Sequence, residues 1–174
     1  LALPPEIAPE QRLFFYPGSS IGNLDPAAAL AMLRRIRRQC AGGGLLVGVD
    51  RVKPRQVLEP AYDDALHLTA AFNLNLLRHV NGVLGSDFDV DDWRHVALFN
   101  SDHSRIEMHL QARHAVTVTW PGDARHFAPG ERIHTENSYK FAPQAFAELL
   151  RRAGFDGIEH WSDARGWFSV FSAR

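Results

Sequence analysis

The residue types and patterns that mark the more specialised protein classes are scarce in this sequence. Its 174 residues include a single cysteine, Cys40, which excludes an internal disulfide framework and makes a reducing cytoplasm the expected compartment. No apolar run approaches the roughly 18 residues that span a bilayer. A net charge of -1 gives no reason to expect binding to nucleic acid or to a membrane. What remains is a globular protein, long enough for one domain with a real core.

Metal-ligand spacings are also missing, although the chain has nine histidines. No histidine pair lies four residues apart in a stretch with a helical pattern, and one cysteine excludes thiolate sites. Four of the histidines fall in turns and alternating strands, where we expect most of them to be surface residues: His103, His109, His114 and His126. The sequence therefore predicts no metal site.

The sequence from Arg12 to Asn23, RLFFYPGSSIGN, organises the rest of the chain. It predicts a short apolar strand that ends at Pro17 and Gly18 and leads through small residues to a helix beginning near Asp25. Such a loop exposes backbone N–H groups at the carboxyl edge of a sheet, where open α/β sheets bind ligands. Glycines allow close backbone approach, and the Asn23 side chain can both donate and accept hydrogen bonds. The alternative is an ordinary connection between a strand and a helix.

The next elements predict a strand–helix–strand unit. Asp25 is a suitable N-cap and Pro26 a suitable first helical residue. An apolar stripe at helical spacing follows, and three glycines, 42–44, end the helix before a buried strand at Leu45–Val49. This order favours a parallel pair of strands with a right-handed crossover.

The rest of the sequence, from residue 54 onward, predicts an insertion followed by the last helix and strands of the sheet-containing part. Residues 54–84 have a mostly helical pattern, and Asp89 could cap a short helix at 90–95. From His95 the period becomes two, and turn residues separate the runs. We expect four strands in this region, at 95–100, 105–112, 116–120 and 132–139. A closing helix at 143–153 and two closing strands at 157–161 and 167–171 follow.

The strand Ile133–Lys140, IHTENSYK, carries polar residues in alternation. Residues two apart share a face of a strand, so His134, Glu136 and Ser138 are expected to point the same way. A carboxylate beside a hydroxyl suits a ligand with N–H donors, such as an imidazole or imidazolium. The alternative is a polar strand that faces solvent.

The first loop could instead carry a nucleophilic serine, because Gly18–Gly22 contains the motif G-x-S-x-G with Ser20 at its centre. A nucleophilic serine needs this pattern at a strand-to-helix turn. The residues after Gly22 lengthen the loop, and no histidine–acid pair can be identified downstream. A serine hydrolase is therefore the weaker alternative.

Five blocks taken together resemble one enzyme family. They are FYPGSSIGNLDP, AYDDALHLTAAFNLNLLRHVN, SRIEMHL, IHTENSYKF and RGWFSVF. In this order they resemble the histidine-specific Nα-methyltransferases of ergothioneine biosynthesis, over nearly the whole chain after Arg12. The resemblance implies an S-adenosylmethionine (SAM)-dependent enzyme with a Rossmann-like class I methyltransferase domain and an inserted helical and antiparallel-β substrate domain.

The resemblance also implies roles for six substrate-binding residues. Asn23 and Tyr62 match positions that hold the substrate carboxylate, and Gly18 matches a glycine beside the substrate amine. The other three match the pocket for the side chain: Glu136 and Ser138 for the imidazole, and Met108 for its lining. The implied reaction is in-line attack of the neutral α-amine on the methyl of SAM, for which no catalytic residue is nominated.

The resemblance fails in one respect. Family members carry the glycine-rich SAM loop and the acidic residue for the ribose in an N-terminal half that precedes this stretch, and no G-x-G motif followed by a helix lies before Arg12. We therefore expect the C-terminal part of such an enzyme, inactive alone, with a cofactor-binding set that is unknown. The expected organisation is a tail or linker at 1–11, a Rossmann-like part at 12–53, the inserted substrate-binding region at 54–140 and the closing Rossmann-like elements at 141–174.

Two further expectations concern partners. The substrate is a small amino acid, histidine or a relative, with a catalytically inactive small-molecule binding domain as the alternative function. The missing half leaves one edge of the sheet uncovered, and an unpaired edge invites homodimerisation.

Overall fold

The computed structural model describes residues 3–8 and 10–174, so three positions of the expected tail 1–11 lie outside the described residues. The chain divides into two compact units. Unit 1 contains the described residues up to Lys53 together with Asp102–Arg105 and Asn137–Arg174. Unit 2 contains Pro54–Ser101 and Ile106–Glu136.

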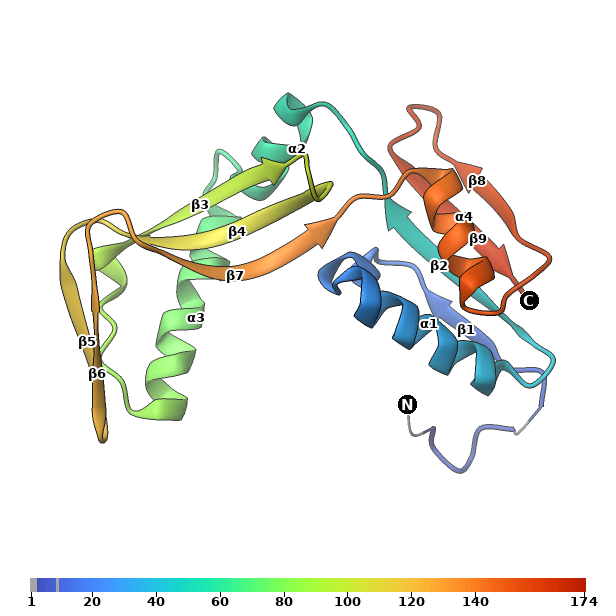
Figure 1. Ribbon diagram of the computed structural model, residues 1–174, viewed down its shortest axis with the longest axis horizontal. Helices are drawn as coiled ribbons and strands as arrows, with labels where there is room; N and C mark the ends of the chain where they lie inside the picture. The colour runs from blue at the N-terminus through green and yellow to red at the C-terminus, as the bar shows by residue number, and fades with distance from the viewer. Residues whose placement is uncertain (1–2, 9) are drawn as a thin grey trace. The chain divides into compact units, whose positions relative to one another are not determined.

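Unit 1 is built on a four-stranded mixed sheet (Figure 1). Its strands lie in the order β1 (Leu13–Tyr16), β2 (Gly44–Asp50), β9 (Phe168–Ala173) and β8 (Glu159–Ser162). β1 and β2 are parallel, which confirms the strand–helix–strand prediction, and the other two pairs are antiparallel. The fold class is therefore mixed α/β.

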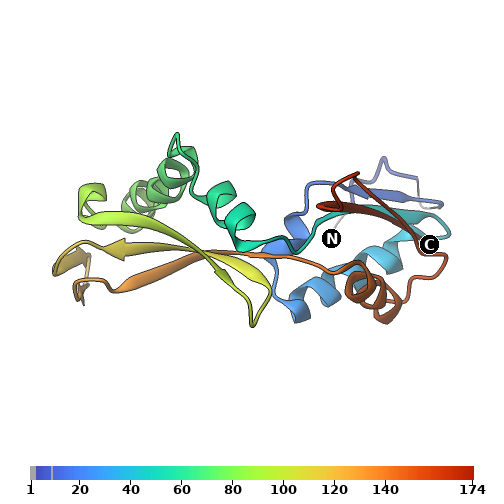
Figure 2. The same ribbon diagram turned by 90° about the horizontal axis from the view of Figure 1, so that it is seen from above.

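Two helices cover one face of this sheet, as Figures 1 and 2 show. In α1 (Pro26–Cys40), the Asp25 side chain accepts a hydrogen bond from the Ala28 backbone N–H at 2.8 Å. In α4 (Pro143–Arg152), the inward residues Phe146 and Leu150 are fully buried. Both helices pack into one apolar core with Leu45, Val47 and Phe171 of the sheet.

The other face of the sheet is less well covered. Leu13 and Phe15 of β1 are 69% and 68% exposed, while the alternate residues Phe14 and Tyr16 pack against the core. β1 is also an edge strand of the sheet within the described residues, because only β2 pairs with it. An apolar edge with one exposed side is a surface that another segment can cover.

Unit 2 combines two helices with two small sheets. The helices are α2 (Arg55–Tyr62) and α3 (Leu68–Leu84). One sheet has the order β3 (Trp93–Asn100), β4 (Arg105–Ala112), β7 (Arg132–Tyr139), and the other is the hairpin of β5 (Val116–Trp120) and β6 (Asp123–Phe127). The ends of β4 and β7, Arg105 and Asn137–Tyr139, belong to unit 1. A cluster with Trp93, Phe127 and Leu77 at its centre holds these elements together.

Three local features differ from the sequence predictions. The helix expected at 90–95 is only the 3₁₀ turn η2 (Val90–Asp92), because β3 begins at Trp93. β6 was not predicted, since Asp123–Phe127 has little apolar alternation and becomes a strand by pairing with β5. The helical stretch after residue 54 is broken at 63–67, where the Asp64 carboxylate accepts hydrogen bonds from the first backbone N–H groups of α3.

Within the part of the chain that the structure describes, no helix is both long and apolar enough to cross a membrane.

Candidate functional site

The loop after β1 is held closely against the end of β2. The Ser19 hydroxyl accepts a hydrogen bond from the Asp50 backbone N–H at 2.8 Å, and Ser19 has a positive φ of 57°. Gly48 lies under the carbonyl oxygen of Pro17, with which a Cβ at that position would collide. These contacts fix the path of the loop at the carboxyl end of the parallel pair.

The 3₁₀ turn η1 (Ser20–Asn23) continues this loop. Gly22 is buried in the turn, and a Cβ there would lie 2.8 Å from the carbonyl oxygen of Tyr139. Only glycine lets the turn approach the end of β7 this closely. Gly18 and Asn23, both predicted substrate residues, lie in the same loop and are exposed.

A buried lysine joins the loop to Ser138. The Lys140 side chain is fully buried, and its Nζ lies 3.0 Å from Oδ2 of Asp50 and 2.7 Å from Oγ of Ser138. Lys53 forms an ion pair with the other carboxylate oxygen of Asp50. A charge this deeply buried is stable only when it is paired and hydrogen-bonded.

This network was missed by the sequence analysis. A signal was present, because Asp50 directly follows the apolar strand Leu45–Val49 and Lys140 directly follows IHTENSY. The consequence is that Ser138 and the loop with Gly18 and Asn23 are joined in one hydrogen-bonded system, through Lys140 and Asp50. Because Lys140 donates to Ser138 Oγ, the hydroxyl directs its own proton toward a different acceptor.

In unit 2, two more predicted residues lie in one apolar cluster. Met108 is 4% exposed and packs with Leu58 and Ile106, and Tyr62 packs against the same cluster. The Tyr62 carbonyl oxygen lies 2.7 Å from His95 Nε2, which fixes the end of α2. These contacts place the C-terminal end of α2 beside β4.

A carboxylate of α2 is also fixed. Glu59 Oε1 accepts hydrogen bonds from Arg55 at 2.8 Å and from the Phe99 backbone N–H at 2.9 Å. The hydrogen bond from Arg55 is the largest cause that lowers the pKa of Glu59, and the Phe99 N–H adds to it. Glu59 therefore stays ionised and ties α2 to β3.

Glu136 is half-buried on β7, and its carbonyl oxygen lies 3.1 Å from His134 Nε2. Glu136 and Ser138 lie two residues apart within an observed strand, so strand geometry directs them to the same face. Of the six predicted substrate residues, Gly18, Asn23 and Ser138 belong to unit 1, and Tyr62, Met108 and Glu136 belong to unit 2.

The expectation that most of four named histidines lie at the surface is confirmed, with one exception. His109 is only 9% exposed on β4, whereas the other three, His103, His114 and His126, are exposed. Burial is the largest cause that lowers the pKa of His109, and a hydrogen bond from its ring to the Glu107 carboxylate opposes this shift. The position of β4 is responsible, because it is the central strand of its sheet and all of its residues after Arg105 are buried, on both faces.

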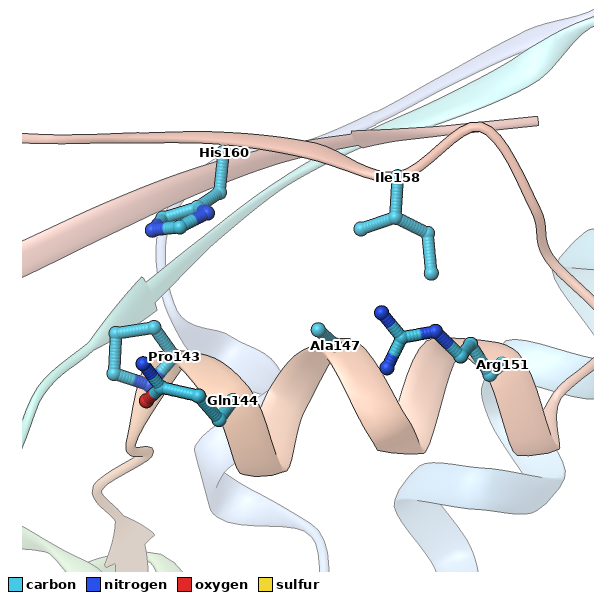
Figure 3. Close-up of a pocket in the computed structure, with 6 residues that line it drawn as sticks. All are labelled: Pro143, Gln144, Ala147, Arg151, Ile158 and His160. Atoms are coloured by element: carbon cyan, nitrogen blue, oxygen red, sulfur yellow. The ribbon is translucent and has the colours of Figure 1, made fainter.

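A hollow of unit 1 contains none of the predicted site residues. It lies between α4 and the residues around the start of β8, and Figure 3 shows Ile158 and His160 pointing toward α4. Its volume of about 240 Å³ is below the roughly 300 Å³ at which small-molecule pockets begin. We assign it no ligand.

The parallel pair has a tightly held loop at its carboxyl end, the edge at which open α/β sheets commonly bind ligands. The family described as "Histidine-specific methyltransferase, SAM-dependent" matches the chain over residues 1–174. The chain therefore belongs to this family, as the resemblance of its motifs indicated. The serine hydrolase alternative is not favoured.

Two relatives show how far the similarity extends. The chain is 44% identical over 163 residues to "Histidine N-alpha-methyltransferase" of Mycolicibacterium smegmatis, covering 92% of this chain and 51% of that protein. It is 29% identical over 166 residues to "Ergothioneine biosynthesis protein 1" of Schizosaccharomyces pombe, covering 94% of this chain and 22% of that protein. The chain thus spans about half the length of the first relative and about a fifth of the second.

A solved structure of an S-adenosylmethionine-dependent methyltransferase from Clostridium acetobutylicum superimposes with a TM-score of 0.48 at 10% identity. The superposition covers 97% of this chain and 60% of that one. The fold class rests on the sheet topology described above rather than on this similarity.

Proposed function

We propose that the protein containing this chain transfers a methyl group from SAM to the α-amine of histidine or a closely related amino acid. The observation that carries the proposal is the pair of Glu136 and Ser138 on β7, with Ser138 held by the buried Lys140. Family membership and the names of the relatives support it.

The pair is suited to a neutral imidazole. Such a ring has one N–H donor and one unprotonated nitrogen that accepts. A carboxylate at Glu136 accepts from the N–H, and a hydroxyl at Ser138, which already accepts from Lys140, donates to the other nitrogen. An analogue without these groups would leave buried polar atoms unpaired, which is a strong basis for discrimination.

The other four residues would hold the rest of the amino acid. Asn23 and Tyr62 bind its carboxylate in this proposal, Gly18 lies beside its amine, and Met108 lines the side-chain pocket. A model α-amine has a pKa of about 8, so enough free base exists near neutral pH without a strong general base. Positioning of this amine is then the main contribution of these residues.

The described residues do not fit a complete SAM site. The loop after β1 packs closely against neighbouring backbone, with Gly22 against Tyr139 and Pro17 against Gly48. When bound to the whole protein, SAM supplies the electrophilic methyl group, and we assign none of its contacts to this chain.

A first prediction follows for the 174-residue chain alone, which we expect not to bind SAM with useful affinity. Isothermal titration calorimetry with SAM measures this directly. Binding in the micromolar range would show that the described residues form more of the cofactor site than proposed. Titration with histidine in the same experiment tests the alternative of a binding domain without catalysis.

A second prediction tests the role of Glu136 in the complete enzyme. Glu136→Ala should raise the KM for histidine far more than the KM for SAM, because the carboxylate contacts only the amino acid. Glu159→Ala, at an exposed position on β8, is the matched control and should change neither. Equal increases in both constants for Glu136→Ala would contradict the assignment.

The domain organisation and the sheet edge complete the proposal. We infer that residues 54–140 act as the substrate-binding insertion between the Rossmann-like parts 12–53 and 141–174. We also infer that the exposed edge strand β1 is covered by a further strand, from the same polypeptide or from a second copy. Light scattering of the complete protein distinguishes the two, because only the second requires a dimer.

A further inference from the structure

A polar cluster lies on the three-stranded sheet of unit 2, made of three residues that are neighbours in sequence of the proposed substrate residues Met108 and Glu136 but are not among them. Glu107 and His109 are two residues apart on β4, so they share a face, and each is 9% exposed. The neighbouring strand β7 contributes His134, which is exposed. One ligand atom from each of the three residues lies within 4.8 Å of the other two.

We propose that Glu107, His109 and His134 bind a divalent first-row transition metal ion of the zinc type. Two imidazoles and one carboxylate form a donor set that suits Zn²⁺, Co²⁺ or Ni²⁺, whereas Mg²⁺ and Ca²⁺ prefer oxygen ligands alone. With three protein ligands, a fourth position stays open for water or another small ligand, on the side of the exposed His134.

The carboxylate is already oriented for this role. Asn100 Nδ2 donates a hydrogen bond to Glu107 Oε1 at 2.9 Å, and Glu107 Oε2 lies 3.2 Å from His109 Nε2. A second asparagine, Asn73, donates to the backbone carbonyl of His109 at 3.2 Å. Polar groups around a metal site hold its ligands in this way.

His109 also has a polar atom that the protein leaves without a partner. Its Nδ1 is buried and makes no hydrogen bond within the described residues, while its Nε2 faces Glu107. Either ring nitrogen can serve as a metal ligand, and the protein satisfies only one. A buried nitrogen of this kind is rare and calls for an explanation such as a bound ion or water.

Closing the cluster around an ion requires the three ligand atoms to move toward one another, and His134 to leave the Glu136 carbonyl oxygen 3.1 Å from its Nε2. Zn²⁺ bonds to nitrogen and oxygen measure about 2.0–2.2 Å, so the three ligand atoms must approach more closely than they do here. The rings of His109 and His134 are stacked, with centroids 4.7 Å apart. Because His134 is exposed, its side chain can rotate toward the other two without repacking the core.

The alternative is a hydrogen-bonded Glu107–His109 pair with an exposed histidine stacked on it and no ion. A titration of the 174-residue chain separates the two. We expect Zn²⁺ to bind with one-to-one stoichiometry in isothermal titration calorimetry, and Co²⁺ to give the visible absorption of a site with nitrogen ligands. Neither measurement depends on methyl transfer or on SAM.

Two variants localise the binding. His134→Ala removes an exposed ligand, so it should fold normally and weaken Zn²⁺ binding by more than about 100-fold, beyond the effect of losing an outer partner of a ligand. His126→Ala, which removes an exposed histidine of β6, is the matched control and should bind as the unchanged protein does. Glu107→Gln should weaken binding while keeping the shape of the side chain.

Three results would overturn the proposal: no saturable binding by the unchanged protein, undiminished binding by His134→Ala, or equal loss in His134→Ala and His126→Ala. The last would show that surface histidines collect the metal without forming a site.

Discussion

The two units bury their polar residues in different ways. Unit 1 has one continuous apolar core of fifteen buried residues, and its buried charge, Lys140, is paired with Asp50. Unit 2 has two smaller clusters, of six and three buried residues. It also buries four polar residues, at Asn73, Glu107, His109 and Gln111. The comparison shows that unit 1 pairs its buried charge at the edge of one large apolar core, whereas unit 2 buries polar side chains on its three-stranded sheet, where we propose a metal site.

Among the substitutions that test this comparison, Lys140→Met should have the largest effect on the stability of the fold. Removing one partner of a buried ion pair leaves Asp50 with only Lys53, and the loss should be about 2–3 kcal/mol in the free energy of unfolding. Urea denaturation followed by circular dichroism measures it. A variant as stable as the unchanged protein would show that the network is not needed for the fold of unit 1.

Two glycine-to-alanine substitutions, one in each unit, should change the free energy of unfolding in opposite directions. Gly22→Ala in unit 1 places a Cβ 2.8 Å from the Tyr139 carbonyl oxygen and should destabilise by about 1–3 kcal/mol. Gly82→Ala in unit 2 is its control, since Gly82 lies within α3 and a Cβ there would meet nothing within 4 Å. It should stabilise by about 0.5–1 kcal/mol, because alanine is the better helix former. Thermal unfolding of both variants measures the difference, and a loss at Gly82 equal to that at Gly22 would remove the contrast.

The smallest effect concerns the start of α3 in acid. Hydrogen bonds from the Thr69 and Leu68 backbone N–H groups lower the pKa of Asp64 to about 2. Because the folded pKa lies below the unfolded value of about 3.9, this carboxylate stabilises the fold above pH 4. Its contribution is lost as the pH falls through about 2.

Asp64→Asn should therefore reduce stability at pH 7 and flatten its decrease in acid, as measured by urea unfolding at a series of pH values. Asp102→Asn, in the exposed turn between β3 and β4, is the control. An unchanged acid profile in Asp64→Asn would mean that the capping hydrogen bonds do not contribute to stability.

Much of the local structure was predictable because it depends on neighbours in the sequence. Asp25 and Pro26 start α1, and its apolar stripe faces the core with Leu33 and Ile36 buried. The alternation of VTVTW appears in β5, where Val118 is buried between exposed threonines. Periodicity failed where pairing decided the structure, as in β6, and where a capping residue was followed by only one turn, as at Asp89.

The site residues, too, were predictable where they depend on spacing along the chain and not where they depend on contacts between elements. The strand-to-helix loop pattern together with the motif resemblance selected Gly18 and Asn23, and strand periodicity together with that resemblance selected Glu136 and Ser138. The proposed metal ligands do not have the helical spacing expected of a histidine pair, because Glu107 and His109 are two apart on a strand and His134 comes from a neighbouring strand. The available signal was the sequence E-M-H, in which alternate residues of a strand carry ligand atoms.

The sequence by itself determined the parallel unit of β1, α1 and β2, the strand that carries Glu136 and Ser138, and membership of a methyltransferase family. Each of these depends on spacing along the chain, which is visible in one dimension. Only the tertiary structure decided that Lys140 and Asp50 join Ser138 to the first loop, and that His109 is buried beside Glu107 and His134. These contacts link residues on different elements, and their energies come from burial and charge pairing, which exist only once the chain has folded.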